Sequence, residues 1–404
     1  MKINLLCLFA LWLITSTSYA QVDPQVQQII NQVNLDSLTS YVEELSGQVP
    51  IVINGKSYTI QSRHKNYPGN KLAADYIAQK FKSFGLVPEY LNYSITGRDV
   101  FAIQWGTDYP DQKYIICAHY DSMPNDSLSP GADDNASGIA AVLEAARILS
   151  QYTSKYTIIY ALWDEEEQGM VGSLNWVYQA FNADWIITGA INIDMIGWDS
   201  DDDHKLWINT KDIGNSIMLS DKALEVNAIY QLGLDPQVLN PGYGSDNRPF
   251  WDYGYGAIGV EEFYGTDWND YYHTQNDKLN KFNLPYFQKC VRMIVGTLAS
   301  ITDLNQTVYV SQEKIIPKDI MLSQNYPNPF NPSTVIKYSV PEQSLVTIKI
   351  FDIIGNEVET LVNEEKPVGR YEVNLSANNL ASGVYFYQIK AGKYIETKKM
   401  TLIK

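Results

Sequence analysis

The sequence predicts an α/β domain followed by a small all-β sandwich. Between about Leu35 and Thr302, segments with a helical apolar period alternate with short apolar runs that are typical of buried strands. This alternation predicts a three-layer α/β/α domain around a mostly parallel, mixed sheet. After about Ser323 only short alternating runs remain, with turn residues between them, and these indicate a β-sandwich.

Composition excludes several classes of protein. The chain has 404 residues, with 30 Lys and Arg against 46 Asp and Glu, which gives a formal net charge of −16. This charge argues against a nucleic-acid partner, because nothing would neutralise a phosphate backbone. Three cysteines are too few for a disulfide scaffold, and we expect Cys117 and Cys290 to be buried thiols.

The N-terminus has the pattern of a secretory signal peptide. Met1-Lys2 gives a positive start, Leu5–Ile14 is apolar, and Ser18-Tyr19-Ala20 resembles a cleavage site. Residues 1–20 are therefore predicted to direct export and to be removed. An uncleaved anchor helix is the alternative, although the apolar run is short for a bilayer span.

The α/β domain is predicted to cover residues 21–304. Its first clear helix is Leu72–Phe84, and Gly85 follows it at the position of a C-terminal cap. Further strands are expected at Tyr114–Ala118, Tyr156–Leu162, Ile186–Ile193 and Ala257–Val260, and further helices at Ile139–Leu149, Ser173–Phe181, Asn215–Leu232 and Leu284–Ile301.

Residues 305–320 are predicted to be a linker, because they show no clear period. The segment Tyr326-Pro-Asn-Pro-Phe-Asn-Pro-Ser333 follows and cannot form regular structure. Residues 321–404 are assigned to the sandwich. Its six expected strands are Val335–Val340, Val346–Phe351, Glu357–Val362, Tyr371–Leu375, Val384–Ile389 and Tyr394–Leu402.

Acidic side chains and histidines gather where the predicted strands end. They are His119 and Asp121, the run Asp164–Glu167, Asp194, and His273 in a loop rich in Gly, Asn and Asp. Ligands of open α/β sheets bind beyond the carboxyl ends of the strands, and several carboxylates there repel one another unless a cation offsets their charge. His with Asp or Glu, without thiolates, suits Zn²⁺, or Co²⁺ and Mn²⁺ as substitutes.

Two of the four histidines, His119 and His273, belong to this group. His119 and Asp121 lie two residues apart at a strand end, so the carboxylate is placed to orient the imidazole. The other two, His64 and His204, lie in polar runs and are expected to be solvated. Each acidic group alone also has an ordinary explanation as a turn residue, helix cap or solvated loop.

Six segments resemble the motifs of the co-catalytic di-zinc aminopeptidases, metallopeptidase family twenty-eight. They are His119-Tyr-Asp-Ser122, Pro130-Gly-Ala-Asp-Asp-Asn-Ala-Ser-Gly138, Glu166-Glu-Gln-Gly-Met-Val-Gly-Ser173, Asn192-Ile-Asp-Met-Ile-Gly197, Ser245-Asp-Asn-Arg-Pro-Phe-Trp251, and Tyr272-His-Thr274 with Asp277. Their order and approximate spacing fit that family over about Leu35 to Ile301.

The resemblance implies a role for each matching residue. Asp134 would bridge two zinc ions, and Asp133 would be its non-ligand neighbour. One zinc ion would take His119 and Asp194, and the other would take Glu167 and His273. Glu166 would be the general base that acts on a metal-bridging hydroxide, and Tyr272 would help hold the tetrahedral intermediate. The function implied is a secreted zinc aminopeptidase that acts on peptides with a free N-terminus.

Two rival functions remain open. A glutaminyl cyclase shares this fold and several ligands but cyclises N-terminal glutamine, and a non-catalytic surface-binding protein on the same fold is the second rival. The Asn135-Ala-Ser-Gly138 helix start and the full set of five ligands favour hydrolysis. A serine hydrolase is disfavoured, because the sequence contains no Gly-x-Ser-x-Gly.

The C-terminal part resembles a type IX secretion sorting domain of the β-sandwich kind. The carrying segments are Tyr326-Pro-Asn-Pro-Phe-Asn-Pro-Ser333, Phe351-Asp-Ile-Ile-Gly355, Ser382-Gly-Val-Tyr-Phe-Tyr387 and Lys398-Lys-Met-Thr-Leu-Ile-Lys404. This resemblance implies that outer-membrane secretion machinery is a partner and that the protein is secreted or held at the cell surface. An accessory sandwich that contacts carbohydrate or cell wall is the alternative.

Overall fold

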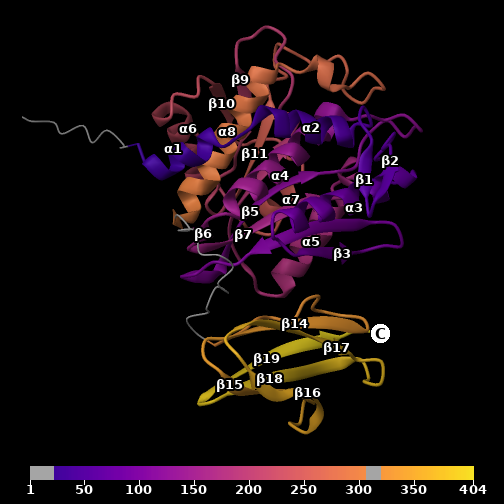
Figure 1. Ribbon diagram of the computed structural model, residues 1–404, viewed down its shortest axis with the longest axis vertical. Coiled ribbons are helices and arrows are strands. Elements are labelled where there is room, and N and C mark those ends of the chain that lie inside the picture. The colour runs from indigo at the N-terminus through magenta and orange to yellow at the C-terminus, as the bar shows by residue number, and fades with distance from the viewer. Residues whose placement is uncertain (1–21, 306–319) are drawn as a thin grey trace, which may run out of the picture.

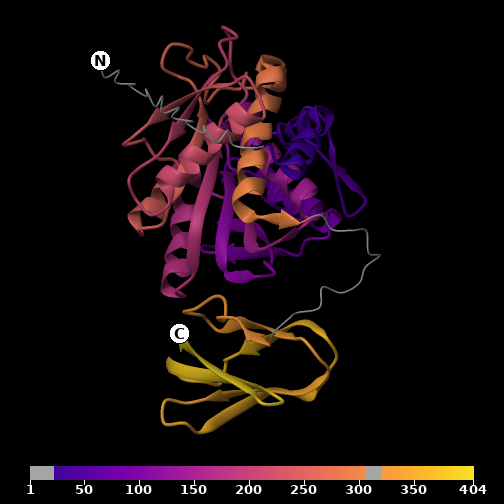
Figure 2. The ribbon, with the colours of Figure 1, turned by 90° about the vertical axis from the view of Figure 1, so that its left-hand side faces the viewer.

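The computed structural model describes residues 22–305 and 320–404, shown as a ribbon in Figures 1 and 2. The predicted signal peptide, residues 1–20, and most of the predicted linker, residues 306–319, lie outside the described residues. The described chain forms an α/β domain and a separate β-sandwich (Figure 1), as the sequence predicts. None of its helices is both long and apolar enough to cross a membrane.

An eight-stranded mixed sheet forms the centre of the α/β domain, in the order β10-β9-β11-β8-β5-β7-β4-β3. The middle strands β11, β8, β5 and β7 run parallel. β9 pairs antiparallel to β11 but parallel to β10, and β4 pairs antiparallel to both β7 and β3. The bounds are β3 Pro88–Asn92, β4 Arg98–Gln104, β5 Tyr109–His119, β7 Tyr156–Trp163, β8 Ile186–Asp194, β9 Lys205–Asn209, β10 Asp235–Leu239 and β11 Ala257–Glu262. The predicted mostly parallel, mixed sheet is therefore confirmed.

Helices cover both faces of this sheet. Side chains alternate along β5, so that Ile116 and Ala118 pack in one core while Ile115 and Cys117 pack in the other. The first core includes α1 (Pro24–Asn31), α2 (Leu35–Leu45), α3 (Pro68–Ser83), α4 (Gly138–Leu149), α6 (Ser216–Ile229) and α8 (Leu284–Thr302), and the second includes α5 (Val171–Asn182) and α7 (Arg248–Asp252). Cys117 and Cys290 are buried free thiols, as expected.

Shorter elements complete the domain. The strands are β1 Ile51–Ile53, β2 Lys56–Tyr58, β6 Thr153–Ser154 and β12 Leu304–Asn305, and single helical turns span Ala132–Ser137, Glu166–Gln168 and Leu279–Lys281. The first two of these turns lie directly before α4 and directly after β7, which places them at the carboxyl edge of the sheet.

The sandwich packs a three-stranded sheet, β13-β14-β17, on a four-stranded sheet, β16-β15-β18-β19. The bounds are β13 Met321–Leu322, β14 Ser333–Val340, β15 Ser344–Phe351, β16 Glu357–Lys366, β17 Gly369–Ser376, β18 Gly383–Ala391 and β19 Tyr394–Leu402. Each of the six predicted strands lies inside an observed one. Only the two-residue β13 has no counterpart in the prediction, because it is too short to show a period.

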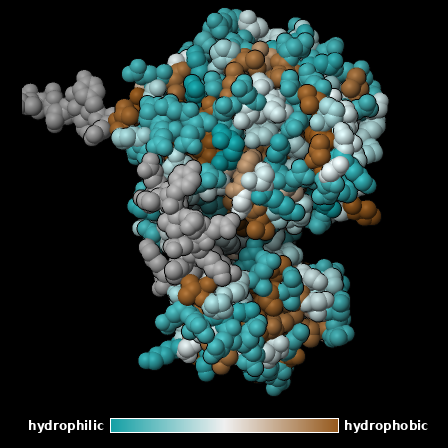
Figure 3. Space-filling model, in the orientation of Figure 1, coloured by the Kyte–Doolittle hydropathy of each residue, from teal (hydrophilic) through white to brown (hydrophobic). Residues whose placement is uncertain are grey.

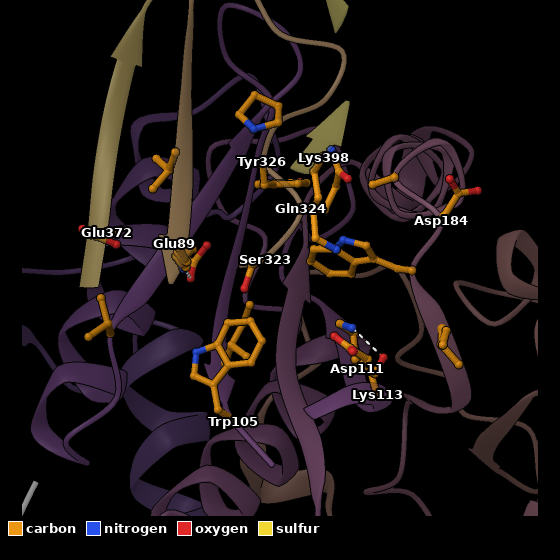
Figure 4. A pocket seen from close by; sticks show the side chains of 18 of the residues that line it. Glu89, Trp105, Asp111, Lys113, Asp184, Ser323, Gln324, Tyr326, Glu372 and Lys398 are labelled. Carbon is orange, nitrogen blue, oxygen red and sulfur yellow. Dashed lines mark hydrogen bonds and ion pairs between the residues drawn. The ribbon is translucent and has the colours of Figure 1, made fainter. Parts of the chain in front are cut away.

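The sandwich contacts the β3–β4 edge of the α/β domain, where the molecular surface narrows in Figure 3. The Tyr326 ring lies 6.1 Å from the Phe101 ring and 5.7 Å from the Trp185 ring, and Lys337 forms an ion pair with Glu89. A cavity of about 590 Å³ lies between the two domains, with Trp105 and Tyr326 on its wall (Figure 4). None of the predicted site residues lines this cavity.

Candidate metal centre and catalytic site

The predicted site residues meet at the carboxyl edge of the parallel strands. His119 is the last residue of β5, Asp194 is the last residue of β8, and Glu166 begins the helical turn that follows β7. Together with Asp134 and Glu167 they line a cavity of about 310 Å³. The parallel sheet brings them together because all these strands end at one edge.

Asp134 faces two separate groups of potential metal ligands. Its Oδ1 lies 3.3 Å from Nε2 of His119, which in turn lies 3.3 Å from Oδ1 of Asp194. Its Oδ2 lies 2.9 Å from Nε2 of His273, which lies 3.0 Å from Oε2 of Glu167. Each group keeps its ligand atoms within 4.8 Å of one another. One carboxylate thus offers one oxygen to each of two neighbouring cation sites.

Asp121 orients residues of both groups. Its Oδ1 lies 3.3 Å from Nδ1 of His119 and accepts the backbone N–H of Glu166 at 3.0 Å, and its Oδ2 accepts the backbone N–H of Glu167 at 3.2 Å. Asp121 is fully buried. The expected bracing of the imidazole is therefore joined by a second contact, which fixes the backbone of the glutamate pair.

Asp133 and Asp134 point in different directions. The Asp133 carboxylate accepts the backbone N–H of Gly197 at 2.8 Å and the side-chain amide of Asn269 at 3.1 Å. It therefore ties loops together, whereas Asp134 faces the histidines. Asp277 accepts the backbone N–H groups of both residues, at 2.9 Å and 3.0 Å. Sequence reasoning gave Asp277 no role, because its partners are backbone groups.

A buried arginine connects the backbone segments that carry the site. Arg63 is fully buried and donates to the backbone carbonyls of Tyr120, Leu45, Pro130 and Gly131. It thereby joins the segment after β5 to the turn that carries Asp134. Nothing in the polar run Arg63-His-Lys65 signals burial from sequence. The expectation that His64 is solvated is wrong, since His64 is only 4% exposed.

Glu166 lies beside the ligand groups but belongs to neither. Its Oε1 lies 3.3 Å from the hydroxyl of Ser245, which also donates to Asp194 Oδ2 at 2.5 Å. Burial, followed by the effect of nearby acidic groups, raises the pKa of Glu166 to about 9. Sequence reasoning included Ser245 only as the first residue of a motif and missed it as a site residue. The hydroxyl group of Ser245 can donate its proton to just one of the two carboxylates at a time.

Tyr272 lines the same cavity, with its ring stacked on His273 at 3.8 Å. Burial is the main reason that the pKa of Tyr272 is raised above its usual value, so the hydroxyl keeps its proton and can donate a hydrogen bond. The backbone is left-handed at Glu165, Met195 and His273, with φ of 58°, 57° and 55°. Non-glycine residues rarely adopt this conformation, and here it occurs at His273, beside Asp194 and beside Glu166.

The donor set fits divalent cations. Burial raises the pKa of Glu167 to about 8, and Oε1 of Glu167 is buried without a hydrogen-bond partner. Burial opposes ionisation of Asp134 as well, but His119 and His273 outweigh it and hold the pKa of Asp134 below its usual value. Two imidazoles and three carboxylates without a thiolate are the ligands that zinc takes in hydrolytic sites.

Comparison with known proteins finds two matching families in this chain. The model of "Peptidase family M28" matches residues 99–298, and that of "Secretion system C-terminal sorting domain" matches residues 324–404. A probable zinc metalloprotease of Pyrenophora teres f. teres is 29% identical over 198 residues, which cover 43% of this chain and 41% of that protein. Aminopeptidase YwaD of Bacillus subtilis is 26% identical over 63% of this chain and 57% of its own length. The chain thus spans about half the length of these relatives.

Two solved structures share the fold. The LapA aminopeptidase of Legionella pneumophila has a TM-score of 0.61 at 20% identity, covering 75% of this chain and 80% of that one. A glutaminyl cyclase of Porphyromonas gingivalis has a TM-score of 0.53 at 17% identity, covering 66% of this chain and 98% of that one. At these identities the likeness concerns the fold. Residues 99–298 of this chain form a domain of peptidase family M28, and residues 324–404 form a secretion system C-terminal sorting domain.

Proposed function

We propose that this protein is an exported aminopeptidase that works with two zinc ions. The observation that carries the proposal is the position of Asp134. One of its carboxylate oxygens lies in the group of His119 and Asp194, and the other lies in the group of His273 and Glu167. A single carboxylate between two such groups suits a two-metal site. The relative named as a probable zinc metalloprotease supports the same choice of metal.

The proposed ligands are His119, Asp134 and Asp194 for one ion, and Asp134, Glu167 and His273 for the other. Two bound zinc ions supply Lewis-acid activation of a water molecule and of the scissile carbonyl. Asp121 holds the imidazole of His119 in place, and Asp277 holds the backbone of Asp134. The chain therefore contributes donor atoms whose side chains lose little conformational entropy when zinc binds.

Glu166 is proposed as the general base. It borders the cavity without belonging to a ligand group. Burial alone favours its protonated form, but two bound cations would favour the carboxylate, which would take the proton of the attacking water and return it to the leaving amine. Ser245 restrains one of its oxygens. Tyr272 is proposed to donate a hydrogen bond to the carbonyl oxygen as that atom gains negative charge.

The free amino terminus of the substrate is proposed to bind among carboxylates. An N-terminal ammonium group needs negative partners, and Glu166 and Asp194 border the cavity and are joined through Ser245. N-acetylated peptides are then poor substrates, because acetylation removes the charge and adds bulk. Export is proposed to use an N-terminal signal peptide, with the sorting domain handled by outer-membrane secretion machinery.

The experiment is a panel of aminoacyl chromogenic substrates, assayed with purified protein before and after chelation and after zinc is restored. Free-amine substrates should be hydrolysed, activity should vanish on chelation and return with zinc, and N-acetylated substrates should react slowly. A peptide that begins with glutamine distinguishes the cyclase alternative, since mass spectrometry separates released glutamine from a pyroglutamyl product. A full rate in metal-free protein, or equal cleavage of blocked and free peptides, would contradict the proposal.

A further inference from the structure

One carboxylate in the catalytic cavity has no part in the proposed chemistry. The cavity wall contains Glu166, every proposed ligand except His273, and a second group of residues that includes Met195, Tyr243, Gly244, Glu261, Tyr264 and Trp268. No Lys or Arg lies among the described residues that line it. Glu262 is occupied elsewhere, because it accepts the backbone N–H of Trp198 at 3.1 Å and contacts Asp133. Glu261 therefore has no role in the proposed chemistry.

Strand order places Glu261 beside the ligands. Glu261 lies on β11 and pairs in parallel register with Asp194 on β8, so the two residues are direct neighbours across the sheet. From Glu167 near β7, the order runs to His119 on β5, to Asp194 on β8 and then to Glu261 on β11. The Glu261 carboxyl therefore borders the side of the cavity beyond Asp194.

The strand is shaped to accommodate this carboxylate. Val260 packs into the core that contains α4 and α8, so its neighbours Gly259 and Glu261 face the opposite side of β11. A Cβ atom at Gly259 would lie 3.2 Å from Oε1 of Glu261 and 3.1 Å from Oδ1 of Asn247. Glycine at position 259 thus leaves the room that the Glu261 carboxyl group occupies.

The neighbours of Glu261 leave its charge unbalanced. The groups that act on its carboxyl group are the negative charge of Asp194 and the neutral side chains of Asn209 and Tyr264, so none of them supplies a positive charge. Within the described residues, no Lys, Arg or His forms an ion pair with it. An enclosed carboxylate without a cation is unfavourable, and a cationic ligand removes that cost. Tyr243, Tyr264 and Trp268 line the same cavity, so aromatic side chains border the space that an aliphatic stem would fill.

We infer that Glu261 is the residue that selects the substrate, and that it selects peptides whose N-terminal residue is Lys or Arg. This inference rests on the proposed aminopeptidase function and names its substrate class. A neutral N-terminal side chain of the same length fills the cavity but leaves Glu261 without a partner, and an acidic side chain is repelled. The side-chain cation is distinct from the α-ammonium group, which is proposed to bind near Glu166 and Asp194.

The experiment compares kcat/KM for p-nitroanilides of lysine, arginine, norleucine and glutamate, because norleucine keeps the lysine stem without its charge. The wild type should prefer lysine and arginine to norleucine by at least about tenfold and should barely cleave the glutamate substrate. E261Q should lose that preference while its rate on norleucine changes little. E225Q, at a partly exposed glutamate of α6 that lies outside the cavity lining, is the matched control and should behave as the wild type. Zinc content is measured for each variant, so that loss of a ligand site is seen separately.

The outcomes separate the two proposals. If no substrate is cleaved by zinc-loaded wild type, the proposed aminopeptidase function fails. If norleucine is cleaved as well as lysine, the function stands and the inference about Glu261 is overturned. If E261Q lowers the rate on all four substrates by the same factor, Glu261 acts on the shared α-ammonium group or on Asp194, and the inference is again overturned.

Discussion

The carboxylate of Asp277 accepts a 3.0 Å hydrogen bond from the backbone N–H of Asp134, the residue whose own carboxylate faces both histidines. Asp277 is buried and lies four residues after His273 on the same loop. One short loop therefore supplies an imidazole to the site and also fixes the backbone of the carboxylate between the two ligand groups. Metal affinity should depend on this acid although it is not a proposed ligand.

Replacement of Asp277 tests this dependence. Asp277→Asn keeps a carbonyl oxygen that can accept the backbone N–H groups, so it should retain most zinc. Asp277→Ala removes the acceptor and should weaken zinc binding by about 10–100-fold, the usual effect of losing a group that supports a metal ligand. Competition with a chelator of known affinity measures both variants. Equal affinity of Asp277→Ala and wild type would show that the loop is held by other contacts.

The adjacent glutamates should respond differently to the same substitution. Glu166→Gln should keep two zinc ions per chain and lower turnover by about two to four orders of magnitude, because it removes only the proposed base. Glu167→Gln should instead release zinc from one site, since Oε2 of Glu167 faces His273. Elemental analysis and single-turnover rates measure the two effects. The reverse pattern would mean that the two roles are exchanged.

Stability of the metal-free protein should fall as the pH rises. Burial raises the pKa of Asp246 to about 7 and that of Asp277 to about 8. Burial acts against the His273 cation, but Asp134 and Glu167 outweigh it and raise the pKa of His273 to about 10. For all three groups the folded state binds a proton more tightly than the unfolded chain. Their stabilising effect is therefore complete below the unfolded values and is lost as the pH rises through the folded ones.

Thermal unfolding provides the measurement. The midpoint of the metal-free protein should be lower at about pH 8.5 than at about pH 6, and the zinc-loaded protein should show a smaller difference, because bound cations replace the protons. A metal-free protein that becomes more stable over this range would contradict the assignment of the raised pKa values.

Much of the site was predictable because ligand positions coincide with strand ends. The apolar run Tyr114–Ala118 and its position before His119 were enough to place that imidazole at the sheet edge. The outer strands β3, β4, β9 and β10 were not predicted. β3, β9 and β10 have only five residues each, whereas β4 was missed although its middle is buried. Arg63 was missed for a different reason. Its burial depends on four carbonyls from distant segments, and no local pattern encodes such a contact.

The contact between the domains should contribute stability but no chemistry. Tyr326 of the sandwich forms ring contacts with Phe101 and Trp185 of the α/β domain. Tyr326→Ala should lower the stability of the α/β domain by about 1–3 kcal/mol, as expected for two aromatic pairs, and should leave kcat/KM unchanged. Glu372→Ala, in the wall of the interdomain cavity, is the control for loss of a side chain without loss of an aromatic pair. A change in kcat/KM would indicate that the contact reaches the catalytic cavity.

Removal of residues after Leu304 should leave catalysis intact and block export. All the side chains that face the candidate metal centre come from residues up to Asp277, and the closing helix α8 ends at Thr302. The truncated chain should therefore fold and hydrolyse substrate at close to the full-length rate, with the small loss of stability expected from the missing Tyr326 contact. In a host that has type IX secretion machinery, the full chain should reach the surface or medium and the truncated chain should stay in the periplasm. Fractionation with an activity assay on each fraction measures both effects. If the truncated enzyme reached the medium normally, residues 324–404 would not be needed for export, and an accessory role of the sandwich would replace the sorting role.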